Sequence, residues 1–430
     1  MSTLRPKPLD TTPPPLTDAQ VDALVEKPSP LALVDANVRG QWWHAVVRKV
    51  SYRLREDGAL VRTEQQPIHT VHTPHEPLPE TWGLPPTENL SMQTVPEARA
   101  WQSGTDVVIR AHAVAPKPVR ELAAGVVVGK HLHRLQVFGR RRSVFSQGRV
   151  QFTEPELFER IPLRWELAYG GLDRVAMEQA LAQLAQRMDA VEWRRSRAFF
   201  KRAFAQTVPL VYARNPVGMG YVADAVAEAL DGALLPHIEL AHDRLTPERF
   251  AYGRPLHWLH RPVPGGMDYV DLRMFPRSAM LGLPPPGWDC VPPLRQIAEV
   301  QWGQLPEDFC GGNLLTAEGE ALNTVVHPDA QRCAATGLRL PRLQGNEPVS
   351  LMGLHAERPR WGFQLPSERP AFTVPGQGRL GTQLYQIFID ADAGRLELLW
   401  AAPWQADRAL EPDEGRERLQ HIQTHVERLS

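Results

Sequence analysis

The hydrophobic residues of this chain fall mainly in runs of strand length that are separated by turn residues. The segment "QWWHAVVRKVSYRL", residues 41–54, is rich in β-branched and aromatic side chains, and Asp57, Gly58 and "ALVRT" follow it. Two such runs around an Asp-Gly turn predict a β-hairpin. Near the other end, "LYQIFIDADAGRLELLW" predicts a second hairpin, with its turn at Asp392 to Gly394. This pattern favours a fold made mostly of antiparallel strands.

Three further segments continue the pattern: "TDVVIRAHAVA", "AAGVVVGKHLHRLQVFG" and "RIPLRWELAYGG". The 41 prolines are scattered rather than repeated, which favours extended segments and rigid turns. Because single cores stop growing at roughly 250 to 300 residues, a chain of 430 residues has room for more than one core. We expect an α+β protein with a mostly antiparallel β body over residues 40–402, built as a sandwich or barrel-like sheets and open to division into two sub-domains.

Helices are expected in three places outside the strand pattern. Residues 1–39 are interpreted as a flexible lead with a short helix from Thr17 to Glu26. A long helix inserted at about 174–206 is predicted from apolar residues at spacings of four and three: Met177, Leu181, Leu184, Met188 and Val191. A C-terminal helix within 403–430, from Pro412 onward, is predicted from the apolar stripe Leu419, Ile422, Val426 and Leu429. Each stripe packs either on its own domain or on a protein partner.

The charges of the chain nearly cancel, with 48 basic and 49 acidic residues. This balance argues against a non-specific nucleic-acid binder and against a membrane-surface protein. A local basic run, interpreted as a solvated helix face, comprises Arg194, Arg195, Arg197, Lys201 and Arg202. Three widely spaced cysteines fit neither a disulfide framework nor a metal knuckle. With no secretion signal and no apolar run of membrane-spanning length, the expectation is a cytoplasmic protein without nucleic-acid or membrane partners.

The stretch "RWELAYGGLDR" holds two carboxylates, Glu166 and Asp173, on either side of a glycine pair. Two carboxylates that face one another are the machinery of a carbohydrate-active hydrolase, which is one alternative for the function. The other interpretation is a glutamate at a strand end that accepts backbone N–H groups. The serine, zinc and β-lactamase motifs that would supply a nucleophile or a metal are absent from the sequence, so no catalytic residue is predicted.

A second tempting motif is "NPVGMGYVADAVAEAL", in which Gly218, Gly220 and Ala223 match G-x-G-x-x-A. This spacing would suit a nucleotide-binding module. However, the rigid Asn215-Pro216 pair interrupts the approach from the preceding strand, and no second βαβ unit follows. A glycine turn set by that pair is the favoured interpretation, and no nucleotide cofactor is expected.

Histidines gather in "HTVHTPH", with His69, His72 and His75, and in "HLH", with His131 and His133. Histidines at a spacing of three would suit a metal site on a helix, but the surrounding prolines disfavour a helix there. The sequence supplies no matching set of further ligands. A surface loop is therefore the interpretation, and no metal is predicted.

Short motifs also occur in a characteristic order along the chain. The first are "VVRKVSYRL" with Lys49, "SGTDVVIRAHAVAP" with Asp106, and "LQVFGRRRSVF" with Arg141. The later ones are "IPLRWELAYGGLD", "NPVGMGY", "LLPHIEL" with Glu239, and "LQGNEPVSLMGLHAERPRWGFQLP" with Gly345. As an ordered set, these segments resemble a bacterial family of unknown-function domains encoded beside type VI secretion effectors, whose characterised members act as effector adaptors or chaperones.

The resemblance implies a non-enzymatic adaptor whose partners are the N-terminal region of a secreted toxin effector and a secretion spike protein. The helical stripe Leu419, Ile422, Val426 and Leu429 is the candidate contact for such a partner. Glycine permits backbone angles and close approaches that other residues cannot make, so the most specific motif residues are interpreted as structural corners of a β scaffold. These residues are Glu166, Tyr169, Gly170, Gly171, Asp173, Asn215, Pro216, Gly218 and Gly220.

Overall fold

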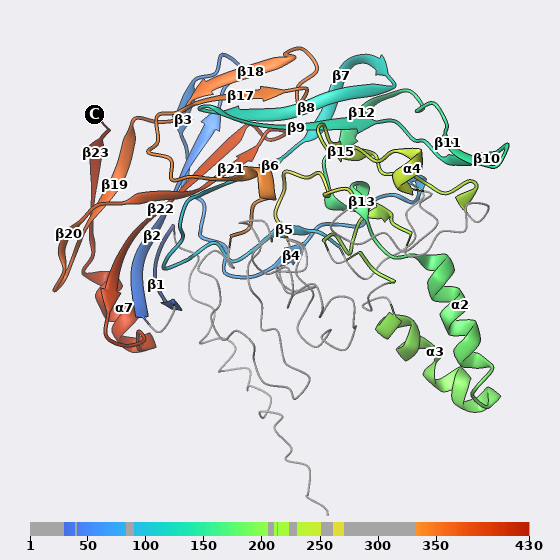
Figure 1. Cartoon of the computed structure of the whole chain (residues 1–430). Helices are drawn as coiled ribbons and strands as arrows, with labels where there is room; N and C mark the ends of the chain where they lie inside the picture. Colours follow the sequence, from blue (N-terminus) through green and yellow to red (C-terminus); the bar gives the residue numbers. More distant parts are fainter. Residues whose placement is uncertain are drawn as a thin grey trace, which may run out of the picture.

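Strands dominate the architecture of the protein (Figure 1). The structure, a computed structural model, describes residues 30–38, 41–82, 90–204, 210–212, 214–222, 230–250, 261–270 and 332–429. Most strand pairs are antiparallel, so the expected mostly antiparallel β fold is confirmed. The short helix expected from Thr17 to Glu26 lies outside the described residues, as do Cys290 and Cys310. None of the described helices is both long and apolar enough to cross a membrane.

The largest sheet contains seven strands in the order β1-β2-β22-β21-β6-β16, with β3 paired to β2. These strands are β1 (Leu31–Val38), β2 (Gln41–Leu54), β3 (Leu60–Arg62), β6 (Thr105–Arg110), β16 (Arg339–Leu340), β21 (Gln383–Asp390) and β22 (Arg395–Ala406). The β2–β3 and β21–β22 hairpins confirm both turns predicted from the sequence. Strands β2 and β22 pair from Trp42 opposite Ala406 to Arg53 opposite Arg395. The two ends of the β-rich region are therefore neighbouring strands in one sheet.

A second sheet contains five strands, all antiparallel, in the order β15-β9-β8-β17-β18. They are β8 (Glu121–Val128), β9 (His131–Phe138), β15 (Ile238–Leu240), β17 (Pro348–Met352) and β18 (Arg360–Gln364). Figure 1 shows this sheet lying across the end of the large one. The main hydrophobic core joins them, because Val126 and Leu135 of the second sheet belong to the same buried cluster as Val107, Ile387 and Leu398 of the first.

Smaller sheets and short helices surround this body. One of these is the three-stranded sheet β20-β19-β23. The others are the two-stranded sheets β10–β11, β7–β12, β13–β14 and β4–β5. Their bounds are β4 (Thr73–Pro74), β5 (Met92–Thr94), β7 (His112–Val119), β10 (Ser143–Ser146), β11 (Arg149–Phe152), β12 (Phe158–Pro162), β13 (Tyr169–Gly170), β14 (Met219–Gly220), β19 (Glu368–Val374), β20 (Gly378–Leu380) and β23 (Gln423–Arg428). The short helices are η1 (Glu80–Trp82), η2 (Trp165–Leu167), α4 (Pro247–Phe250) and η7 (Thr336–Leu338).

The predicted helical insertion is present, but it is a hairpin of two helices and not one long helix. Helix α2 covers Arg174–Ala185 and helix α3 covers Ala190–Phe204. The chain breaks between them because the Asp189 carboxylate accepts the backbone N–H groups of Val191 and Glu192, which starts a new helix. An aspartate followed three residues later by a glutamate is a helix-start signal that the apolar spacing had obscured.

The predicted C-terminal helix is correct only in its first half. Helix α7 (Pro412–Gln420) begins with Pro412 in its first turn, as expected. After Gln420 the chain turns into strand β23, which pairs antiparallel with β19 from Gln423 to Arg428. The helix prediction is wrong for this second half because the edge of β19 supplies backbone partners, and a tertiary contact of that kind overrides local helix propensity.

The apolar stripe that was expected on one helical face is consequently divided between two elements. Leu419 is half-buried on α7, and Ile422 packs against a buried cluster that contains Phe372 and Trp404. Leu429 lies close to Gly345, whereas Val426 is 55% exposed on β23. The four residues therefore do not form a continuous helical surface for a partner.

Candidate functional site

The structure brings two of the sequence motifs together. Strand β13, from "AYGG", and strand β14, from "NPVGMG", pair in parallel, with Tyr169 opposite Met219 and Gly170 opposite Gly220. The backbone N–H of Met219 also donates to the Ala168 carbonyl, 2.9 Å away. The two motifs thus form one interlocked corner, which we call the glycine corner and define as residues 168–171 with 215–220.

Asn215 holds the glycine corner from within. Its side chain is fully buried, and its Nδ2 donates to the carbonyl oxygens of Trp165 and Tyr169 at 2.9 and 3.1 Å. Its own carbonyl oxygen accepts the backbone N–H groups of Gly171 and Gly218. The neighbouring Pro216 is buried as well. The amide nitrogen and the backbone carbonyl of Asn215 thus tie the two motifs together through protein backbone, whereas its Oδ1 is buried without a hydrogen-bond partner among the described residues.

The glycines of the corner have conformations and neighbours that exclude side chains. Gly171 has φ of 88° and Gly220 has φ of 82°, in the left-handed region that favours glycine. A Cβ on Gly171 would collide with the carbonyl of Gly218, and one on Gly218 would collide with the Asn215 amide. These close approaches are to the protein's own backbone and side chains, which explains the glycines without a bound phosphate.

Glu166 is buried in η2 and surrounded by donors. Its Oε1 accepts the backbone N–H of Ser91 at 3.0 Å, and its Oε2 accepts the Ser91 hydroxyl at 2.7 Å. The guanidinium of Arg164 donates to both oxygens. The carboxylate therefore joins the loop that contains Ser91 to η2.

Asp173 has a different local task. Its carboxylate accepts the backbone N–H of Ala176 at 2.9 Å and so caps the N-terminus of α2. Glu166 and Asp173 are thus held by separate sets of donors, one at Ser91 and Arg164 and the other at a helix start.

Tyr169 completes the corner on its other side. Its hydroxyl accepts from Arg261 at 3.2 Å, and its ring meets that of Tyr212 edge-on at 5.2 Å. The ring of Tyr212 in turn stacks on Tyr221, over which Arg261 lies at 4.9 Å. Burial raises the pKa of the Tyr169 hydroxyl above its usual range. The tyrosines therefore stay neutral and act as packing groups at ordinary pH.

One group of carboxylate and imidazole side chains among the described residues has the spacing of metal ligands: His69, Glu97 and Glu397. The ammonium of Lys49 already occupies this place, at 2.5 Å from Glu97 and 3.1 Å from Glu397. Lys49 and Glu97 are fully buried. Lys49 thus supplies a buried cation between the two carboxylates, and Arg395 adds a second positive charge 3.3 Å from Glu397. His72 and His75 of the same histidine motif are not part of the group.

Other motif residues are also paired in the interior. Asp106 accepts from Arg332 at 2.7 Å and lies 3.4 Å from Arg99. Arg141 pairs with Glu239, and its guanidinium lies 3.9 Å from the centre of the Phe138 ring. Burial raises the pKa of the Glu239 carboxyl above its usual value. These pairs join segments that are distant in sequence, which gives the motif residues a role in holding the sheets together.

A cavity of about 480 Å³ opens beside this framework. Two His-Asp pairs line it: His75 with Asp268 at 3.0 Å, and His112 with Asp392 at 2.7 Å. The rest of the lining comprises arginines, prolines and apolar side chains: Arg110, Arg160, Arg164, Pro79, Pro162, Leu78, Trp82, Ala111 and Leu163. We call this space the His-Asp cavity. Sequence reasoning missed it because its parts come from separate segments, and only the histidine motif gave a local signal.

A second candidate surface is the α2–α3 hairpin, which projects from the β body in Figure 1. Met177 and Leu181 are the buried residues of α2. Helix α3 leaves Val191 60% and Phe199 68% exposed. Exposed basic residues surround them: Arg194, Arg195, Arg197 and Lys201. The hairpin therefore presents apolar and positively charged groups together to solvent.

The sequence of the chain from residue 39 to residue 401 matches a family model described as an uncharacterized protein conserved in bacteria, DUF2169. The chain belongs to the DUF2169 family. No curated protein and no solved structure matches it. The DUF2169 region begins just before β2 and ends within β22, so it contains the glycine corner, the buried ion pairs and the His-Asp cavity. Helix α7 and strand β23 follow the DUF2169 region.

Proposed function

We propose that this DUF2169 protein is a non-enzymatic adaptor that binds the N-terminal region of a secreted toxic effector and helps to load it onto a type VI secretion spike. The ordered motifs that resemble known effector adaptors support this proposal. The carboxylates and glycines of those motifs are engaged in structural contacts, which supports recognition rather than catalysis as the activity.

The observation that carries the proposal is the exposed face of α3. Phe199, at 68% exposed, packs edge-on against Phe200, which stacks at 6.5 Å on Trp193. Large aromatic groups surrounded by arginines are typical of the centres of protein interfaces. The charge of α3 favours a partner whose contact surface is acidic around an apolar centre.

The test is capture of the effector by purified adaptor. The toxin encoded by a neighbouring gene is co-expressed with the tagged adaptor, and recovery of the complex is measured. We expect stable capture by the native chain and at least a tenfold loss with Phe199→Asp, which places a negative charge at the centre of the basic face.

A matched control is Leu157→Asp, which introduces the same charge at another exposed apolar residue, 61% exposed and outside the helices. This variant should capture the effector like the native chain. Equal loss in both variants, or no loss in either, would remove α3 as the contact. Absence of any complex with neighbouring secreted toxins would overturn the adaptor function itself.

A further inference from the structure

We propose that the His-Asp cavity binds a carboxylate that is joined to an apolar group. This proposal goes beyond the adaptor function and holds independently of it. It rests on the way in which charged and apolar side chains from several parts of the chain converge on one space of about 480 Å³. Cavities of roughly 300 to 1,000 Å³ that combine apolar walls with a few polar groups are the usual form of small-molecule sites.

The carboxylates of the cavity are already occupied by protein donors. Asp268 is buried and accepts from His75 and from Nε of Arg110, at 3.0 and 3.3 Å. The pKa of Asp268 is lowered, because the attraction of Arg110 and the hydrogen bond from His75 outweigh its burial. Asp268 therefore stays ionised, and its oxygens accept hydrogen bonds from protein groups.

The second pair repeats this arrangement with greater exposure to solvent. Asp392 accepts from Nδ1 of His112 at 2.7 Å and from Nη2 of Arg160 at 3.1 Å. A carboxylate can only accept, so Nδ1 carries the proton and Nε2 is the remaining ring nitrogen of His112. Within the described part of the chain, Nε and Nη1 of Arg160 have no acceptor, and this side chain is 56% exposed.

Arg164 donates to Glu166 and to the Glu76 carbonyl. Arg110 donates to Asp268 and to the Gln93 carbonyl. The polar groups left for a ligand are therefore mainly the N–H donors of Arg160, and they select an acceptor. A carboxylate fits best, because hydrogen bonds from a guanidinium to an ionised acceptor are stronger than those to a neutral one. The other walls are apolar: Leu163 is buried and Leu78 and Trp82 are half-buried. An apolar group attached to the carboxylate would remove this surface from water.

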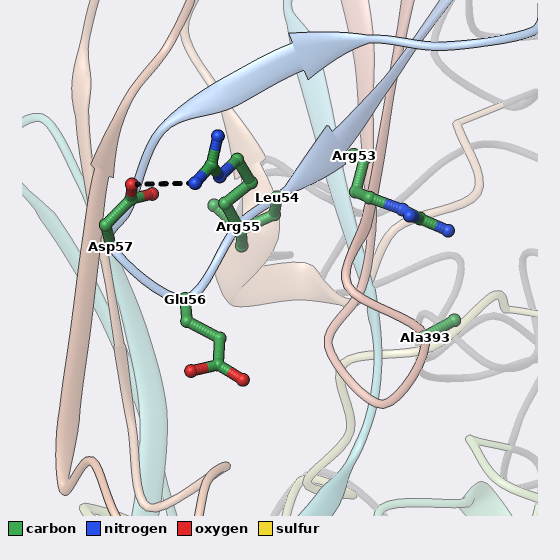
Figure 2. A pocket seen from close by; sticks show the side chains of 6 residues that line it. All are labelled: Arg53, Leu54, Arg55, Glu56, Asp57 and Ala393. Atoms are coloured by element: carbon green, nitrogen blue, oxygen red, sulfur yellow. Dashed lines mark ion pairs between the residues drawn. The ribbon is translucent and has the colours of Figure 1, made fainter.

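Another hollow of similar volume, about 490 Å³, shows why volume alone does not identify a ligand site. It lies between the β2–β3 turn and the β21–β22 turn, and Figure 2 shows its charged side chains pointing in different directions. Arg55 and Asp57 lie 3.6 Å apart there, with side chains 59% and 58% exposed. Exposed ion pairs of this kind contribute little free energy. The charged side chains of this hollow also do not converge on one point (Figure 2), in contrast to those of the His-Asp cavity.

The experiment is calorimetric titration of the full chain with N-acetyl-leucine, its neutral amide, hexanoate and acetate. We expect saturable binding of N-acetyl-leucine and hexanoate, with the amide and acetate at least tenfold weaker. Arg160→Gln should lower the affinity for N-acetyl-leucine at least fivefold. Arg55→Gln, in the comparison hollow, should leave this affinity unchanged. An unchanged melting temperature of Arg160→Gln separates lost binding from lost folding.

The source of the carboxylate is decided by a pentapeptide that ends in leucine, compared with the same peptide amidated at its C-terminus. Tighter binding of the free-acid peptide than of N-acetyl-leucine identifies a polypeptide chain end as the ligand. Exclusion of the peptide with retained binding of hexanoate identifies a small organic acid. Equal binding of acid and amide, no binding at all, or equal weakening by both arginine variants overturns the proposal.

Discussion

The ammonium of Lys49 lies 2.5 Å from the carboxylate of Glu97, and neither side chain has any exposure to solvent. Glu397 lies on the other side of the same ammonium at 3.1 Å and is 2% exposed. Glu97 also accepts the backbone N–H of His69 at 2.8 Å, and Tyr269 donates its hydroxyl to the other carboxylate oxygen. Removing a charge from water costs several kcal/mol, so these ions are stable only as a set.

Replacement of Lys49 by methionine should destabilise the protein by about 3 to 5 kcal/mol, because Glu97 would remain buried without its cation and Glu397 would keep only its ion pair with Arg395. Chemical unfolding measures this difference in the free energy of unfolding. Lys117→Met removes an exposed lysine and should change stability by less than about 0.5 kcal/mol. Similar values for the two variants would show that the buried ammonium is dispensable.

The glycine corner should be far less tolerant than an exposed turn with the same backbone angle. Gly376 has φ of 80° and open space around it, so Gly376→Ala should cost only about 1 kcal/mol of backbone strain. Gly171→Ala adds a collision with the Gly218 carbonyl and should cost roughly 2 to 5 kcal/mol. Thermal and urea unfolding compare the two, and equal costs would refute the close packing of the corner.

Glu166→Gln should lower stability by roughly 1 to 3 kcal/mol, since Ser91 and Arg164 would lose a charged acceptor. Glu154→Gln, at a side chain that is 83% exposed, is the neutral control. We also expect the native protein to hydrolyse no glycan or ester in a substrate library. Turnover that disappears in Glu166→Gln would contradict the adaptor proposal and favour a hydrolase.

Stability should fall with acid in the pH range between about 6.5 and 4. Burial lowers the pKa of His133 to about 4, and that of His237 to about 4 as well. The unfolded chain binds these protons at higher pH than the folded one, so the contribution is complete above the unfolded pKa and is lost as the pH falls. At most it amounts to roughly 3 kcal/mol for each histidine.

Urea unfolding at several pH values measures how steeply the free energy of unfolding falls with acid. Isosteric variants of His133 and His237 then show whether these two residues cause the fall. Nε2 of His133 bonds to the Gly266 carbonyl, and Nδ1 of His237 bonds to the Phe138 carbonyl. His133→Gln and His237→Asn each retain a donor near the same place. Each variant should show a shallower loss of stability below pH 6.5, and an unchanged slope would mean that other groups cause it.

Deletion of residues 421–430 should lower the free energy of unfolding by about 2 to 3 kcal/mol, because β19 loses its partner strand and Ile422 and Leu429 lose their contacts. Val426→Thr, at an exposed position of β23, should leave the melting temperature unchanged. A truncated protein with native melting would show that the C-terminal segment is a free tail.

Much of the local structure followed from the sequence. The Asp57-Gly58 turn and the Asp392 to Gly394 turn were recognisable because turn residues between β-branched runs specify a hairpin by short-range geometry. The structural role of Gly171 and Gly220 was recognisable for a similar reason, since glycine is needed where φ is positive. The start of α7 at Pro412 is another local signal.

The partners of buried groups were decided only by the tertiary structure. Lys49 meets Glu97 and Glu397, and Arg141 meets Glu239, across long stretches of chain that no periodicity connects. The parallel pairing of β6 with β21 and the strand at the C-terminus depend in the same way on which sheet edge lies nearby. The His-Asp cavity has the same origin, because its four His and Asp residues become neighbours only when the separate segments pack. Sequence determines turns and strands through local backbone preference, whereas ion pairs, edges and cavities arise from long-range packing.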